Sequence, residues 1–223
     1  SDDYTHFLHN GKSLFEKRFI EVLKFHEPGL APVKDESGWH HINSNGQSIY
    51  NERYLRAFGY YFARAAVTTE DGCFHITEKG NAAYKDQYIW CGNYQENLCA
   101  VKSFTKDYFH IDLDGSRIYN NSFLYVGDFK DGIACVRSLN GWFHIDAAGK
   151  PLNNRLFLGL GVFHKGYATA KDEKGWFHIN KLGQEIYPER YEIIEPFYNG
   201  VSLVGISDSN YLISERGKII NEF

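Results

Sequence analysis

A histidine recurs at the same position of a repeat of about 34 residues, and this regularity constrains the fold more than any other feature. Six successive copies carry it, in segments such as GWHHINSNG from Gly38 and GWFHIDAAG from Gly141. The six histidines are His6, His41, His75, His110, His144 and His178. A seventh copy, SNYLISERG from Ser209, has Leu212 at this position. Tandem copies of one unit predict an architecture in which each unit buries its apolar surface against its neighbours.

Each copy contains two strand patterns. The first alternates small residues, as in GIACV from Gly132. The second is the WFHI strand, in which Trp142 and His144 lie on one face. Phe143 and Ile145 lie on the other. Because both faces carry large apolar groups, we expect sheets that are covered on both sides. A turn ending in glycine, a short strand and an aromatic connector complete the unit.

The pattern predicts an all-β fold of tandem antiparallel β-meander repeats, six plus a terminal hairpin, in a single β-repeat domain over residues 1–223. Burial of both faces favours a β-propeller, with the small-residue strand innermost. The alternative is an open β-solenoid or superhelical repeat array, because about 34 residues is short for a four-stranded blade.

Composition narrows the classes of function. A net charge of −4 and the lack of long Lys/Arg runs argue against nucleic acid, and no apolar stretch is long enough for membrane insertion. Four scattered cysteines are expected to be buried free thiols, which favours a reducing, cytoplasmic location. Because the sequence contains no methionine, we expect it to be part of a longer protein.

Three segments carry a resemblance to a known family. They read YVGDFKDGIACV from Tyr125, GWFHIDAAGKPL from Gly141 and GWFHINKLGQEIY from Gly175. In these the sequence resembles the bacterial WG (or KWG) repeat proteins, and the resemblance extends over nearly the whole chain. It implies a bacterial, all-β interaction module in proteins that often carry further domains. It implies no catalytic residues. The chain departs from the family pattern in the added histidine and in Cys73 and Tyr108, which replace tryptophan.

The repeated histidines allow two interpretations. A metal site needs three or four ligands at about 2.1 Å from one ion, whereas symmetry separates equivalent residues by about 10 Å. We therefore expect no metal and a structural role, with each imidazole bonded to a backbone group or to the Asp two residues on, such as His110 with Asp112. The aromatic position of the WFHI strand is expected in the core; its tryptophans are Trp39, Trp142 and Trp176.

Aromatic residues that the repeat does not demand are better candidates for a binding surface, because loop ends are where repeat proteins bind partners. The candidates are Tyr60, Tyr61, Trp90, Tyr94, Tyr125, His164 and Tyr198. Catalytic and cofactor motifs are missing from the sequence, so we expect no enzyme and no cofactor. The sequence favours a non-catalytic binding or scaffolding domain for a protein or peptide partner. A lectin-like, carbohydrate-binding module is the alternative, and an enzyme is the third hypothesis.

Overall fold

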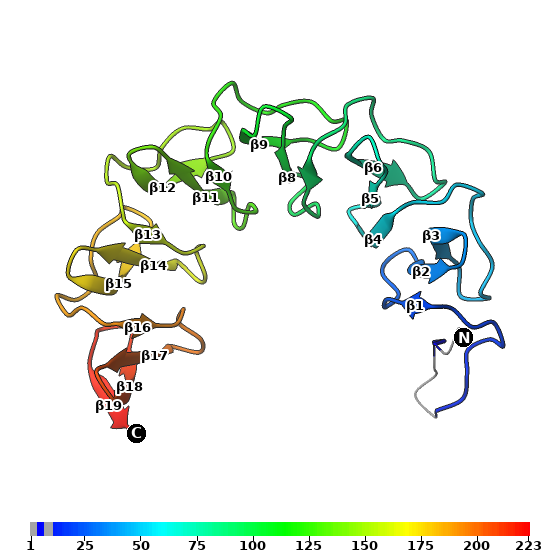
Figure 1. The fold of residues 1–223 in the computed structure, drawn as a ribbon. Helices are drawn as coiled ribbons and strands as arrows, with labels where there is room; N and C mark the ends of the chain where they lie inside the picture. The colour runs from blue at the N-terminus through cyan, green and yellow to red at the C-terminus, as the bar shows by residue number, and fades with distance from the viewer. Residues whose placement is uncertain (1–3, 7–10) are drawn as a thin grey trace. The chain divides into compact units, whose positions relative to one another are not determined.

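The computed structural model describes residues 4–6 and 11–223. Within these residues all regular structure is β, and the strands form six antiparallel sheets, one per repeat. The chain divides into two compact units between Arg117 and Ile118, with three sheets in each (Figure 1). The prediction of an all-β fold built from antiparallel meanders is confirmed. Leu8, which stands where other copies of the repeat have Asp or Asn, lies outside the described residues.

The first unit contains three sheets of three strands each. Their strands are β1 (Glu21–Val22), β2 (Ala31–Asp35), β3 (Gly38–Ile42), β4 (Arg56–Tyr61), β5 (Arg64–Thr68), β6 (Cys73–Thr77), β7 (Trp90–Cys91), β8 (Cys99–Lys102) and β9 (Tyr108–Ile111).

The second unit contains two sheets of three strands and a last sheet of four. Their strands are β10 (Tyr125–Val126), β11 (Ile133–Ser138), β12 (Gly141–Asp146), β13 (Gly159–Leu160), β14 (Tyr167–Asp172), β15 (Gly175–Asn180), β16 (Ile193–Ile194), β17 (Val201–Ile206), β18 (Ser209–Ser214) and β19 (Ile219–Glu222).

The small-residue strand lies in the centre of each three-stranded sheet, between the connector strand and the WFHI strand. The expectation that it is innermost is therefore corrected. Its two faces belong to different cores: Ala65 and Val67 pack into the core shared with the preceding sheet, and Ala66 packs into the core shared with the next. Small side chains are needed because a sheet covers each face of this strand.

Register explains why small residues face the histidines. In the antiparallel pairs, His75 lies opposite Ala66, His144 opposite Cys135 and His178 opposite Thr169. A small cross-strand neighbour leaves room for the imidazole on the same face. In the last sheet, the position opposite Leu212 is Leu203, so both members of the pair change together.

The glycine that ends each hairpin turn is held by two constraints. Gly149 has a φ of +74°, which L side chains rarely adopt. A Cβ added there would lie 2.6 Å from Cγ of Tyr119, a residue of the preceding connector. The hairpin turn of one repeat and the connector of the preceding repeat are therefore packed so closely that an added methyl group does not fit between them.

These constraints can be separated by a matched pair of substitutions. Gly200 has nearly the same φ, +82°, but open space where a Cβ would stand. We expect Gly200→Ala to lower the free energy of unfolding by about 1–2 kcal/mol, from backbone strain alone. Gly149→Ala should cost about 1–3 kcal/mol more, because the added methyl group overpacks the Tyr119 contact. Urea unfolding measures both, and equal losses would contradict the packing role of Tyr119.

Candidate functional site

Within each unit, the repeated histidine joins one sheet to the next along the chain. In β6, the Nε2–H of His75 donates to the carbonyl of Gly92, directly after β7, at 2.9 Å. The same bond spans 17 residues at four more positions, with donor–acceptor distances of 2.6–2.9 Å. These pairs are His6–Leu23, His41–Phe58, His144–Gly161 and His178–Glu195. We call this bond the histidine latch.

A second contact encloses each latch. The aromatic residue two positions beyond the carbonyl lies against the imidazole, with ring centroids 4.0–4.7 Å apart. These rings are Phe25, Tyr60, Tyr94, Phe163 and Phe197. Two of the predicted binding residues, Tyr60 and Tyr94, thus occupy a buried repeat position. They lack the exposed surface that a binding role requires, and they belong to the core.

Three latches have a further hydrogen bond. The hydroxyls of Tyr50, Tyr84 and Tyr187 pair with Nδ1 of His41, His75 and His178. Because the carbonyl accepts from Nε2–H, the neutral imidazole leaves Nδ1 as the acceptor for the hydroxyl.

Of the two partners predicted for the histidine, the latches use the backbone group. His144 donates to the carbonyl of Gly161, while Oδ1 of Asp146, two residues on, accepts the amides of Ala148 and Lys150, both at 2.9 Å, inside the hairpin turn. Oδ1 of Asp112 likewise accepts the amides of Asp114 and Ser116, at 3.0 and 2.8 Å. The acidic residue therefore shapes the turn.

Burial keeps the latches neutral. Loss of hydration lowers the pKa of His41, His75, His144 and His178 from 6.5 to about 4, against the smaller opposing effect of the carbonyl. The arrangement is structural: each histidine is held by one carbonyl and one ring. In the described part of the chain, no group of three or more His, Cys, Asp or Glu side chains could hold a metal ion.

The three tryptophans of the WFHI strands lie beneath cations. Trp39 is buried, with the Arg56 guanidinium 4.1 Å from its ring centroid. Trp142 and Trp176 are half-buried. Their covering cations are Arg137 at 5.8 Å and Lys171 at 5.6 Å, each on the neighbouring strand. The tryptophans thus combine packing with cation–π contact.

Three other predicted residues share the turn between the connector strand and the small-residue strand: Tyr61, His164 and Tyr198. In the first unit, Tyr61 contacts the ring of His26, the equivalent residue of the preceding turn, at 4.8 Å. In the second, His164 lies 4.8 Å from the exposed ring of Tyr198, and its Nδ1 accepts from Nζ of Lys130 at 3.0 Å. The turns of consecutive sheets therefore touch through this position.

The remaining two candidates, Trp90 and Tyr125, occupy the exposed face of a connector strand. Trp90 lies opposite Lys102, and its ring centroid is 6.2 Å from that of Tyr108. Tyr125 lies opposite Arg137 and 5.4 Å from Trp142. The seven candidates therefore belong to three repeat positions: one buried, one in the turns and one on the connector strand.

The sequence interpretation did not predict a set of exposed aliphatic residues at one repeat position. The residue after the buried aromatic of the connector remains exposed in four consecutive sheets. These residues are Leu55 (61%), Ile89 (44%), Leu124 (48%) and Leu158 (62%). The signal was present as the recurring pairs YL, YI, FL and FL. We call these four residues the aliphatic row.

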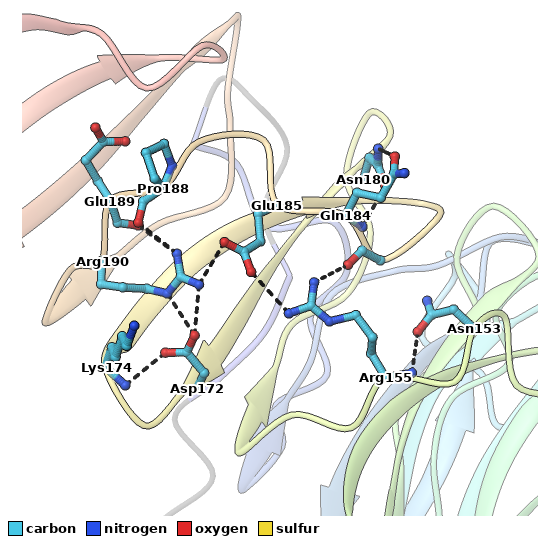
Figure 2. A network of polar contacts seen from close by, with 11 residues as sticks. Asn153, Arg155, Asp172, Lys174, Asn180, Gln184, Glu185, Pro188, Glu189 and Arg190 are labelled. Atoms are coloured by element: carbon cyan, nitrogen blue, oxygen red, sulfur yellow. Dashed lines mark hydrogen bonds and ion pairs between the residues drawn. The ribbon is translucent and has the colours of Figure 1, made fainter.

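Ion pairs join adjacent loops in the second unit (Figure 2). Arg190 contacts Asp172 at 2.8 Å and Glu185 at 2.9 Å. Arg155 reaches from the preceding connector to Glu185 and to the carbonyl of Gly183. The guanidinium of Arg190 holds the pKa of both its carboxylate partners below their usual range.

Comparison with known proteins identifies the repeat class. Residues 176–208 match the family model described as the WG containing repeat. This match confirms, for one copy of the repeat, the resemblance to WG repeat proteins that the sequence shows. No curated protein matches the chain significantly.

Solved structures support the fold. The crystal structure of BamB from Moraxella catarrhalis, a β-propeller, has a TM-score of 0.55 and 13% identity, over 96% of this chain and 77% of that one. The WD40 β-propeller domain of Doa1 has a TM-score of 0.41 and 11% identity, over 74% and 67%. Hsv2 from Kluyveromyces lactis scores 0.49 at 8% identity, over 87% and 77%. The likeness to BamB shows a propeller-like β-repeat fold.

The search for membrane spans gave a negative result: among the residues that the structure describes, there is no helix of sufficient length and apolarity to cross a bilayer.

The latches predict a pH dependence of stability. Since their pKa is lowered on folding, the unfolded chain binds more protons between about pH 6.5 and about pH 4. The free energy of unfolding should be constant above this window and fall within it, by about 3 kcal/mol per latch at most. Four such losses approach the whole stability of a typical domain. A melting temperature that stays flat from about pH 8 to about pH 5 would refute the role of the latches.

A single latch can be tested with a substitution that the chain itself uses. His144→Leu introduces the residue found at Leu212 and leaves the Gly161 carbonyl without its His144 donor. We expect a loss of about 1–3 kcal/mol at neutral pH, with a shallower pH dependence. His164→Leu, at the turn position, is the control and should change stability by only about 0.5 kcal/mol. Equal effects of the two substitutions would exclude a special role for the latch.

Proposed function

We propose that the chain is a non-catalytic binding or scaffolding domain that presents apolar and aromatic surface to a protein or peptide partner. The aliphatic row is the observation that carries this proposal. This repeat position stays aliphatic in four sheets although each residue is 44–62% exposed. Each unit holds two of these residues in consecutive sheets, which suits a partner that contacts both sheets of a unit at once.

The exposed aromatic residues support the same proposal. Trp90 and Tyr125 begin the connector strands β7 and β10, and each directly follows a row residue, Ile89 or Leu124. Rings supply large contact area with little loss of side-chain entropy, and they are enriched among residues that dominate binding energy. Basic neighbours, Lys102 and Arg137, lie directly opposite these two rings. We infer that, within each unit, the two row residues and the ring form a contact surface.

The proposal includes the absence of catalysis and a reducing compartment. The latch histidines, which are the most repeated chemical groups, serve packing. The four cysteines, Cys73, Cys91, Cys99 and Cys135, are buried free thiols in the structure. Free thiols of this kind suit a reducing location such as a bacterial cytoplasm.

Leu124 and Leu158, the two row residues of the second unit, are exposed, so both can be replaced without disturbing the core. We expect the double variant Leu124→Ser/Leu158→Ser to fold normally and to lose the partner retained by the native chain, as measured by quantitative pull-down from a lysate of the source cell. The matched control is Leu139→Ser/Leu182→Ser, which changes two exposed leucines outside the row. A partner held equally by both variants would contradict the proposed surface.

A further inference from the structure

A groove with a volume of about 940 Å³ lies in the first unit, between the connector that follows β6 and the loops around β8 and β9. One wall is residues 84–88, and the other is formed by residues 103–104, Phe109 and residues 114–117. Its volume falls at the upper end of the range for small-molecule sites. We call it the β6–β9 groove.

One exchange distinguishes this groove from its counterpart at the β13–β15 sheet. The repeat position of Asp172, which contacts Arg190 (Figure 2), is Ser103 here, a shorter side chain. The bulky residue next to it, Phe104, is directed to the β6 sheet, where its ring is 3.1 Å from the position of a Cβ added at Gly72.

The lining has the chemistry of a sugar site. None of the described residues that line the groove is aliphatic. Phe104 offers an exposed ring (59%) at the groove, where it can stack on the apolar face of a pyranose. The floor includes the rings of Tyr88 and Phe109, whose centroids are 6.0 Å apart.

Planar polar side chains stand on both walls. Asp86 and Gln87 belong to the connector wall, and Asp114 and Arg117 belong to the hairpin wall. The guanidinium of Arg117 is fixed over the Phe109 ring, 4.1 Å from its centroid. Carboxylates accept from sugar hydroxyls, while amide and hydroxyl groups donate to them, so Asp86 with Gln87 on one wall and Asp114 with Ser116 on the other each supply an acceptor and a donor.

We propose that the β6–β9 groove binds a short segment of an uncharged oligosaccharide. The lining combines two carboxylates, Asp86 and Asp114, with two cations, Lys85 and Arg117, so it carries no net charge and suits an uncharged ligand. The lack of aliphatic lining disfavours a peptide, whose anchors need apolar pockets. The site is separate from the aliphatic row and differs from it in chemistry.

The test is a titration of the isotope-labelled chain with three neutral tetrasaccharides, chitotetraose, cellotetraose and maltotetraose, followed by amide NMR shifts. We expect saturable shifts confined to residues 84–88 and 103–117 for at least one sugar, with a dissociation constant of about 1 mM or lower. Phe104→Ala should weaken that binding roughly tenfold, and Phe104→Tyr should restore it, because stacking needs the ring.

Two controls separate this site from stability and from the proposed partner surface. Leu139→Ala changes the exposed residue at the repeat position of Phe104 in the β10–β12 sheet, and it should leave sugar binding unchanged. Leu124→Ser/Leu158→Ser should also retain sugar binding, so the two proposals fail independently. The inference is overturned if none of the three sugars gives saturable shifts, if the shifts lie elsewhere, or if Phe104→Ala with an unchanged melting temperature binds as the native chain does.

Discussion

The hydrogen bond from a buried imidazole to a carbonyl of the following sheet is the interaction on which the rest of the structure depends. It fixes the distance between consecutive sheets, because the carbonyl must meet Nε2 and the next aromatic must meet the ring face. Small residues on the central strand follow from the same geometry, since Ala66 lies opposite His75. Polar groups inside a β core are costly unless paired, so each latch imposes one register on two neighbouring sheets.

Much of this fold could be predicted from the sequence because the repeat reports packing directly. Alternation in the WFHI strand predicted both buried faces, and the six predicted meanders correspond to the six sheets. The predicted place of the small-residue strand was wrong. A row of small side chains indicates that neighbouring backbone is close, but it does not show whether that backbone lies at a central axis or covers both faces of the strand. The bond partners of the histidines were only partly predictable: a contact that spans 17 residues depends on how one sheet stacks on the next.

The candidate site was harder to predict, because the repeat pattern does not show which of its positions are exposed. Tyr60 and Tyr94 looked unusual only because other copies have phenylalanine at that position, as at Phe163 and Phe197. All four residues place a buried aromatic ring at the same repeat position, and the tyrosines differ only by the hydroxyl. The exposed aliphatic row was overlooked for the opposite reason: Leu55 and Leu158 resemble core residues in the sequence, and only their exposure distinguishes them. The β6–β9 groove could not be predicted because its walls, residues 84–88 and residues 103–117, come together only when one sheet stacks on the next.

The latch also has a direction, because the histidine always lies in the earlier sheet and the carbonyl in the later one. A whole copy inserted anywhere between two sheets would bring a carbonyl for the histidine before it and a histidine for the carbonyl after it. Duplication or loss of complete internal copies thus leaves every donor and acceptor paired. A partial copy would leave an imidazole or a carbonyl buried without its hydrogen-bond partner. Evolution can therefore lengthen or shorten such an array in whole repeats at little energetic cost, while the surfaces that differ between copies diverge independently.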